Sequence, residues 1–185
     1  MDRQVNEQLE VTKKDCEAWD MLCIRPYRTN DSKIIANWCQ DRITFYQWSE
    51  GRLGDFPVPP ERIEEAVSGR IDNDAYFPFV AFDESGIVGF FTLRQPGTEK
   101  GELSFGYVIL SPQARGKGYG KQMLRLGIKF AFDLYGASKV SLEVFENNPN
   151  AYFCYKSVGF QENNTITSYH LCGEEWKSVE MEIHR

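Results

Sequence analysis

The sequence predicts an α/β (α+β) fold in which helices flank a twisted, mixed and mostly antiparallel sheet of about six to seven strands. Three observations support this prediction. Two apolar runs, 77–82 and 87–93, are separated by the turn sequence Asp-Glu-Ser-Gly, which is typical of a hairpin. An amphipathic stretch at 120–135 is typical of a helix. The alternating stretch 139–145 that follows it suits a strand reached by a strand-helix-strand crossover.

The chain is expected to form one domain. Its 185 residues, 42% of them hydrophobic, are enough to bury one sizeable core and rather few for two. Residues 1–20 mix charges with few apolar positions, and the apolar pattern begins at Met21. We therefore expect an N-terminal extension over residues 1–20 and a single domain over residues 21–185.

The first elements of this domain are expected to be a strand and two helices. A short strand is expected at 22–27, and Thr-Asn-Asp at 29–31 is a candidate cap for a helical segment at 34–38. The stretch 45–60 is polar and aromatic and is interrupted by glycines and prolines, so we expect a loop there. A second helix is expected over 60–71, with a proline near its start.

The later elements complete the sheet. A third strand at 102–110 is expected to extend the hairpin into an antiparallel meander, and a basic loop then leads into the helix at 120–135. After the crossover strand, the sequence predicts a short helix at 150–158 and two closing strands at 166–171 and 176–183.

Composition argues against several classes of function. The chain has 21 Lys and Arg against 27 Asp and Glu, a net charge of −6, so a broad basic surface for nucleic acid or anionic lipid is not expected. No apolar run approaches the roughly 20 residues of a membrane span. The five cysteines are scattered without a C-x-x-C pair, so neither a disulfide framework nor a metal site is indicated. We expect a cytoplasmic protein.

The loop at 115–121, Arg-Gly-Lys-Gly-Tyr-Gly-Lys, has the composition of a phosphate-binding loop. Glycine recurs at every second position, and the loop precedes the most amphipathic helix. Backbone N–H groups at a helix N-terminus can converge on a phosphate group. A flexible basic turn is the alternative reading. The spacing fits neither a Walker loop, because Gly118 follows Lys117, nor the dinucleotide fingerprint G-x-G-x-x-G.

This loop resembles that of the GNAT acetyltransferases, which reads R/Q-x-x-G-x-G/A and is matched by Arg115, Gly118 and Gly120. In that family the loop binds the pyrophosphate of coenzyme A, and the preceding strand bulges and lends backbone groups to the pantetheine arm. The resemblance therefore implies acetyl-CoA as co-substrate and assigns it the residues Val108, Ile109, Leu110, Arg115, Gly116, Lys117, Gly118, Tyr119, Gly120 and Lys121.

A second motif downstream strengthens the resemblance. The sequence from Asn148 to Phe160 matches N-x-x-A-x-x-x-Y-x-x-x-G-F at every fixed position. The resemblance assigns Asn148 a hydrogen bond to the pantetheine and Tyr155 the protonation of the departing thiolate. It implies direct attack by an amine, which must be neutral to react. Within the family, the sequence looks like the bacterial acetyltransferases of ribosomal proteins and small amines.

Two glutamates are candidates for the base that accepts the proton of the amine. Glu143 lies twelve residues before Tyr155, as in the ribosomal-protein N-terminal acetyltransferases, where this glutamate acts through water. Glu102 begins the strand that leads to the bulge, where other members of the family carry a base. We favour Glu143. A solvent-facing strand glutamate is the alternative for each.

The acceptor amine is expected to bind near the first helices, where aromatic residues occur together with carboxylates. Candidate binding residues are Trp38, Phe45 and Tyr46, and the alternative that Trp38 and Phe45 are core residues stays open. A small molecule, a peptide N-terminus and a lysine side chain are all possible acceptors, and a homodimer is a possible assembly. The alternative function is an acyl-CoA-binding sensor or interaction module without turnover. A DNA-binding module is disfavoured, because the basic residues cluster in one short loop and no recognition helix is evident.

Overall fold

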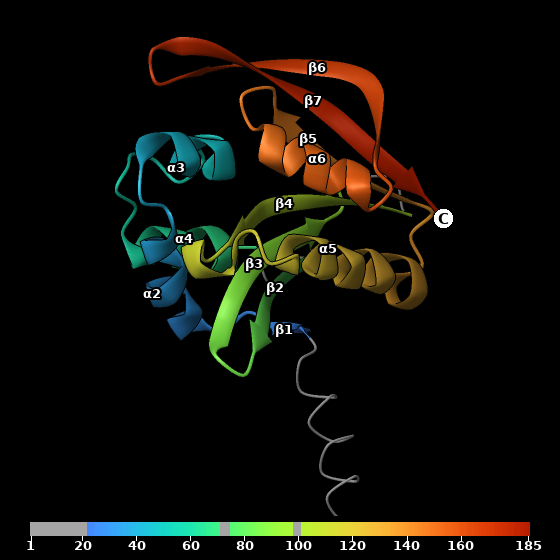
Figure 1. Ribbon diagram of the computed structural model, residues 1–185, viewed down its shortest axis with the longest axis horizontal. Coiled ribbons are helices and arrows are strands. Elements are labelled where there is room, and N and C mark those ends of the chain that lie inside the picture. Colours follow the sequence, from blue (N-terminus) through green and yellow to red (C-terminus); the bar gives the residue numbers. More distant parts are fainter. Residues whose placement is uncertain (1–21, 71–74, 98–100) are drawn as a thin grey trace, which may run out of the picture.

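The computed structural model describes residues 22–70, 75–97 and 101–185, which form a seven-stranded sheet flanked by helices (Figure 1). The strand order is β1-β2-β3-β4-β5-β7-β6. Neighbouring strands are antiparallel except β4 and β5, which are parallel and are joined by the helical crossover. The strands are β1 (Cys23–Pro26), β2 (Tyr76–Asp83), β3 (Gly86–Arg94), β4 (Glu102–Leu110), β5 (Lys139–Phe145), β6 (Gln161–Leu171) and β7 (Glu174–His184).

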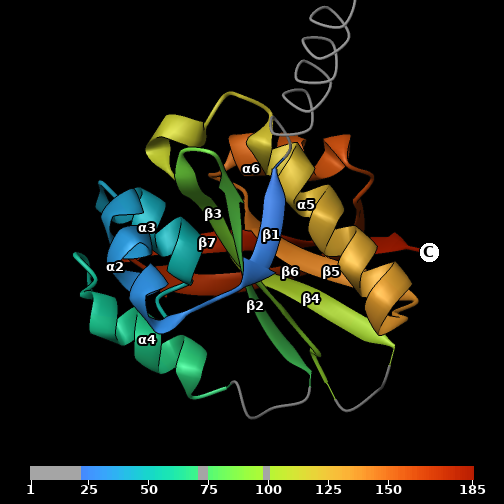
Figure 2. The same cartoon turned by 90° about the horizontal axis from the view of Figure 1, so that it is seen from below.

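Helices cover both faces of the sheet, and Figure 2 shows the two groups on opposite sides of the central strands. One group comprises α2 (Ser32–Ile35), α3 (Arg42–Ser49) and α4 (Pro60–Ser68). The other comprises α6 (Pro149–Ser157) and α5 (Tyr119–Lys129), which continues into a π-helical segment, Phe130–Tyr135. Short 3₁₀ turns occur at Thr29–Asp31, Ala36–Trp38 and Pro112–Ala114. No helix in the described ranges is long and apolar enough to cross a membrane.

Each face of the sheet carries its own hydrophobic cluster. Because successive strand side chains point to opposite faces, Phe90 belongs to the cluster under α2 to α4, whereas Phe91 belongs to the cluster under α5 and α6. Helix α5 approaches the sheet closely at Gly127, where a Cβ atom would lie 2.6 Å from the Phe105 ring. The absence of a side chain at this position therefore sets the distance between α5 and the sheet.

A bulge in β4 interrupts this alternation. Leu103 and Phe105 pack under α5, but Tyr107 packs on the opposite face, and Val108 is again on the α5 side. The register with β3 shifts at the same place, and Tyr107 has a positive φ of 50°. A bulge bends its strand and increases the local twist. The second half of β4 is thereby turned away from its parallel neighbour.

The parallel pairing of β4 with β5 is accordingly short. Glu102, Leu103 and Ser104 pair with residues 139–141, and beyond Ser104 the two strands share no register. β5 pairs with β7 along its whole length instead. The result is a gap between β4 and β5 on the side where both strands end.

Most predicted elements are confirmed, including the fold class, the hairpin, the strand at 102–110 and the crossover. The prediction of a loop throughout 45–60 was wrong, because α3 extends to Ser49. Asp41 caps this helix by accepting hydrogen bonds from the backbone N–H and the hydroxyl of Thr44. The second helix was predicted to run to residue 71 but ends at Ser68, with Gly69 as its C-cap. The expected extension over residues 1–20 lies outside the described residues.

Candidate active site

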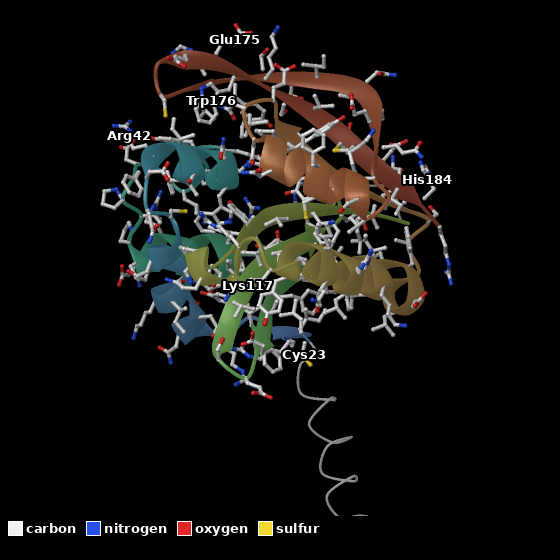
Figure 3. The ribbon with its side chains drawn as sticks, in the orientation of Figure 1. Cys23, Arg42, Lys117, Glu175, Trp176 and His184 are labelled. Atoms are coloured by element: carbon white, nitrogen blue, oxygen red, sulfur yellow. The ribbon has the colours of Figure 1, made fainter. Side chains whose placement is uncertain are left out.

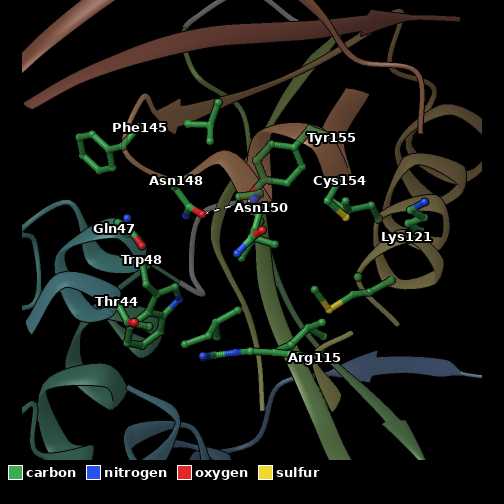
Figure 4. A pocket seen from close by; sticks show the side chains of 18 of the residues that line it. Thr44, Gln47, Trp48, Arg115, Lys121, Phe145, Asn148, Asn150, Cys154 and Tyr155 are labelled. Carbon is green, nitrogen blue, oxygen red and sulfur yellow. Dashed lines mark hydrogen bonds between the residues drawn. The ribbon is translucent and has the colours of Figure 1, made fainter. Parts of the chain in front are cut away.

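A cleft of about 730 Å³ occupies the gap between the diverging ends of β4 and β5. Five segments surround it, and Figure 4 shows their side chains converging from different elements. Its wall is formed by Val108, Ile109 and Leu110 of β4; Glu143, Val144 and Phe145 of β5; Arg115, Gly116, Gly118, Gly120, Lys121, Met123 and Leu124 of the loop and α5; Asn148, Asn150, Ala151, Cys154 and Tyr155 at α6; and Thr44, Gln47 and Trp48 of α3.

The glycines of the loop have two different roles. Gly116 and Gly118 adopt positive φ angles of 75° and 82°, a conformation that glycine takes at little cost. Gly118 is the N-cap of α5, so the loop presents the helix N-terminus to the cleft. Gly120 instead provides space, because a Cβ atom there would lie 3.2 Å from the Cys154 sulfur.

Two of the basic residues in the loop segment line the cleft. Arg115 and Lys121 do so, and an Nη of Arg115 also donates a hydrogen bond to the Trp38 carbonyl at 3.2 Å. Lys117 is exposed and does not line the cleft (Figure 3). The hydroxyl of Tyr119 donates to Asp83 at 2.6 Å, which ties the start of α5 to the β2–β3 hairpin. Of the loop residues predicted to bind the cofactor, Lys117 and Tyr119 therefore do not line the cleft, whereas the others do.

The Asn148 motif builds the opposite wall. Asn148 is the N-cap of α6, and its side-chain oxygen accepts a hydrogen bond from the backbone N–H of Ala151. Pro149 occupies the first helical position, where its missing N–H has no intrahelical partner to lose. The Gln47 side chain reaches across from α3 and donates to the Asn147 carbonyl at 2.9 Å. This contact links the two sides of the cleft at one end.

Tyr155 is presented to the cleft from α6 and is only 7% exposed. Burial raises the pKa of its phenol well above the ordinary value of a tyrosine. The hydroxyl therefore stays protonated at neutral pH and can donate a proton. Burial also raises the pKa of the neighbouring Cys154 thiol, which keeps that sulfur neutral and a poor nucleophile.

Glu143 projects from β5 at the junction of two cavities. Its Oε2 accepts hydrogen bonds from the hydroxyls of Tyr169 and Ser178, both at 2.8 Å. Together with Trp48, Glu143 lines both the large cleft and a small recess on the α3 side of the sheet. A carboxylate held in this way is oriented at the point where the two spaces meet.

Glu102 lies apart from Tyr155 and Glu143. It is at the opposite end of β4, where the strand still pairs with β5, and it forms an ion pair with Lys139 at 2.9 Å. It lines neither the cleft nor the recess. The parallel register thus brings only one of the two candidate bases to the site.

The three aromatic residues predicted to bind the acceptor are buried and do not line the cleft. Phe45 is fully buried, Trp38 is 5% exposed, and the Tyr46 hydroxyl donates to Asp55 at 3.2 Å. Thr44, Gln47 and Trp48 face the cleft instead. Their spacing of three and four residues is that of one helix face, so recognition of Asp41 as a helix cap could have identified them.

The sequence and the fold can be compared with those of known proteins. A model of the acetyltransferase (GNAT) family matches residues 37–160. A spermidine N(1)-acetyltransferase from Vibrio cholerae is 23% identical over 159 residues, covering 85% of this chain and 89% of the relative. A spermine/spermidine N(1)-acetyltransferase from Bacillus subtilis is 30% identical over 96 residues, which cover 49% of this chain and 63% of the relative.

Solved structures show the same fold. The crystal structure of spermidine N-acetyltransferase from Vibrio cholerae in complex with CoA and spermine superposes with a TM-score of 0.76. The alignment covers 89% of this chain and 95% of that one, at 22% sequence identity. At this level of identity the likeness establishes the architecture of the sheet and its helices.

The loop geometry predicts how coenzyme A affinity responds to charge at Gly118. Asn and Asp both tolerate positive φ and have nearly the same shape, so Gly118→Asn serves as the matched control for Gly118→Asp. We expect Gly118→Asp to bind coenzyme A at least tenfold more weakly than Gly118→Asn, because only Asp places a negative charge at the N-terminus of α5. Isothermal calorimetry measures this difference. Equal affinities of the two variants would place the phosphates elsewhere.

Proposed function

The chain belongs to the GNAT family of acetyltransferases, and within that family we propose that it acetylates a primary amine of a small molecule by direct attack on acetyl-CoA. Acetyl-CoA-dependent N-acetylation is the activity of the family, and the chain is an enzyme of this type. One observation supports the proposed mechanism most directly. A protonated phenol and a hydrogen-bonded carboxylate, Tyr155 and Glu143, line the same cleft.

The residues of the cleft fit coenzyme A. The N-terminus of α5, with Arg115 and Lys121 beside it, supplies positive charge for a pyrophosphate. Because nothing lies within 4 Å of a Cβ built on Gly116 or Gly118, phosphate oxygens can approach the loop backbone there. The gap between β4 and β5 then accommodates the pantetheine arm beside Val108, Ile109 and Leu110, with Asn148 as a further hydrogen-bonding partner.

The proposed reaction requires one base and one acid. Glu143 accepts the proton of the attacking amine, directly or through a water molecule, while the amine nitrogen forms a bond to the thioester carbon. The C–S bond then breaks, and Tyr155 donates its phenolic proton to the departing sulfur. Tyr169 and Ser178 orient the Glu143 carboxylate for this step. Glu102 has no place in this scheme.

Two further features belong to the proposal. The names of two relatives, both polyamine acetyltransferases, support a small-molecule amine as acceptor. We retain the cytoplasm as the proposed location and a homodimer as the proposed assembly. Strand β6 is an edge of the sheet and exposes Ile166, and an open edge strand of this kind can pair with a second copy of the chain.

Replacement of Tyr155 by Phe tests the proposed acid. The variant lacks only the hydroxyl, so we expect kcat to fall by about 100- to 10,000-fold, the usual contribution of a general acid. The affinity for acetyl-CoA should change little. Thiol release with a panel of amines measures turnover, and calorimetry measures binding. A variant with wild-type turnover would remove Tyr155 from the mechanism.

Replacement of Glu143 by Gln tests the proposed base through its pH profile. Glu143→Gln should lower the rate at neutral pH, and the rate should recover as pH rises toward the pKa of the acceptor amine, where neutral amine becomes abundant. The control is Glu102→Gln, which should leave the profile unchanged because Glu102 lies outside both cavities. The reverse pattern would transfer the role to Glu102. Absence of thiol release from every amine would favour an acyl-CoA-binding protein without turnover.

A further inference from the structure

The recess beside Glu143 has an unusual set of charges for a site that receives a cationic amine. It is lined by residues of α3, β3, β4 and β5 and by the segment after α3: Trp48, Ser49, Glu50, Arg52, Arg94, Ser104, Phe105, Gly106, Tyr107 and Glu143. Two arginines balance the two glutamates. Its volume is about 20 Å³, which is room for one small polar group and not for a long chain.

The two arginines differ in their pairing. An Nη of Arg52 lies 2.5 Å from a carboxylate oxygen of Glu50. Arg94, at the end of β3, is partly buried, and its guanidinium forms no ion pair or hydrogen bond with any residue in the ranges 22–70, 75–97 and 101–185. A partly buried guanidinium is poorly solvated and strongly favours a carboxylate, which it can bind through two parallel hydrogen bonds. Among the described residues, Arg94 therefore has no direct anionic partner, and its charge acts on Glu50 only through space.

Three polar atoms of the recess are also buried without a hydrogen bond in the described part of the chain. Two are donors, the indole N–H of Trp48 and the hydroxyl of Tyr107, and the third is Oε2 of Glu50, whose contact with Arg52 is an ion pair. Buried polar groups are normally paired, so groups of this kind point to a missing polar partner. Burial raises the pKa of Tyr107, and the nearby arginines, Arg70 and Arg52 first, oppose this increase. Positive charge from these arginines and negative charge from Glu50 therefore both act on this phenol.

We propose that the acceptor is an amine that also carries a carboxylate, which Arg94 binds in the recess while the amine lies against Glu143. This inference rests on the proposed function and narrows it to zwitterionic acceptors such as amino acids. Trp48 and Tyr107 donate the remaining hydrogen bonds to the carboxylate. A polyamine, although it is the acceptor named for several relatives, would bring additional positive charge toward Arg52 and Arg94.

The test compares each acceptor with its own uncharged analogue. Purified protein and acetyl-CoA are combined with α- and ω-amino acids of two to six carbons, with the corresponding carboxamides, and with spermidine. Thiol release gives kcat/KM, which is corrected for the fraction of neutral amine at the assay pH. We expect the best amino acid to exceed its carboxamide by about 10- to 100-fold, the contribution of a hydrogen bond between charged groups.

Variants of Arg94 then test whether this residue causes the preference for a carboxylate. Arg94→Met should remove the preference for the carboxylate and leave the KM for acetyl-CoA unchanged, whereas Arg94→Lys should retain part of it. The control is Arg125→Met, an exposed arginine of α5 that lines neither cavity and should change nothing. Thermal unfolding confirms that each variant is folded.

Three results would contradict the inference, and only the last of them would also contradict the proposed function. Equal rates for amino acids and carboxamides, or a preference for spermidine, would contradict it while leaving amine acetylation intact. A carboxylate preference that survives in Arg94→Met would place the anion elsewhere. Absence of thiol release from the whole panel, together with unchanged coenzyme A binding, would contradict the proposed function as well.

Discussion

The short pairing of β4 with β5 is the constraint on which the site depends. Three residues of each strand are in register, and the bulge at Tyr107 then turns β4 away. Backbone groups that would otherwise bond to the neighbouring strand become available to a ligand. The same bulge moves Tyr107 to the α3 face and Val108 to the α5 face, so that one irregularity contributes residues to both cavities.

In the proposed reaction the two cavities hold different parts of the substrates. The cleft lies between β4, β5 and the helices α5 and α6, and it has the glycine loop at one side and Tyr155 on its wall. The recess lies on the other side of Glu143, beneath α3. It contains Arg52, which pairs with Glu50, and Arg94, which forms no ion pair or hydrogen bond within the described residues. Glu143 and Trp48 are shared by both. In the proposed reaction, a proton acceptor at this boundary lies where an amine, with its carboxylate held in the recess, meets a thioester in the cleft.

Much of this could be predicted from local sequence. The hairpin and the helix at 120–135 follow from periodicity and turn residues, and the two motifs identified the loop and Tyr155 because their spacing is continuous along the chain. The directions in which side chains point were harder to predict. Trp38, Phe45 and Tyr46 suited an aromatic site by composition, yet the phase of the helical turns there directs them into the core.

Long-range register decided the remaining questions. Glu102 and Glu143 are both strand glutamates, and only the parallel pairing of Glu102 with Lys139 shows that Glu102 lies at the wrong end of β4. The sequence around Arg94 does not indicate a binding role. Its place in the recess depends on the pairing of β3 with β4, in which Arg94 lies opposite Ser104. No sequence motif specifies either pairing, so neither could be predicted without the three-dimensional structure of the sheet.

A crystal structure of the protein with coenzyme A bound would test the central claim most directly. The account predicts that the pantetheine lies between the diverging halves of β4 and β5 and that the pyrophosphate oxygens lie about 2.7–3.2 Å from backbone nitrogens of residues 116–120. The sulfur should then be in contact with the Tyr155 hydroxyl. Coenzyme A bound outside this gap, or with its sulfur remote from Tyr155, would contradict the account.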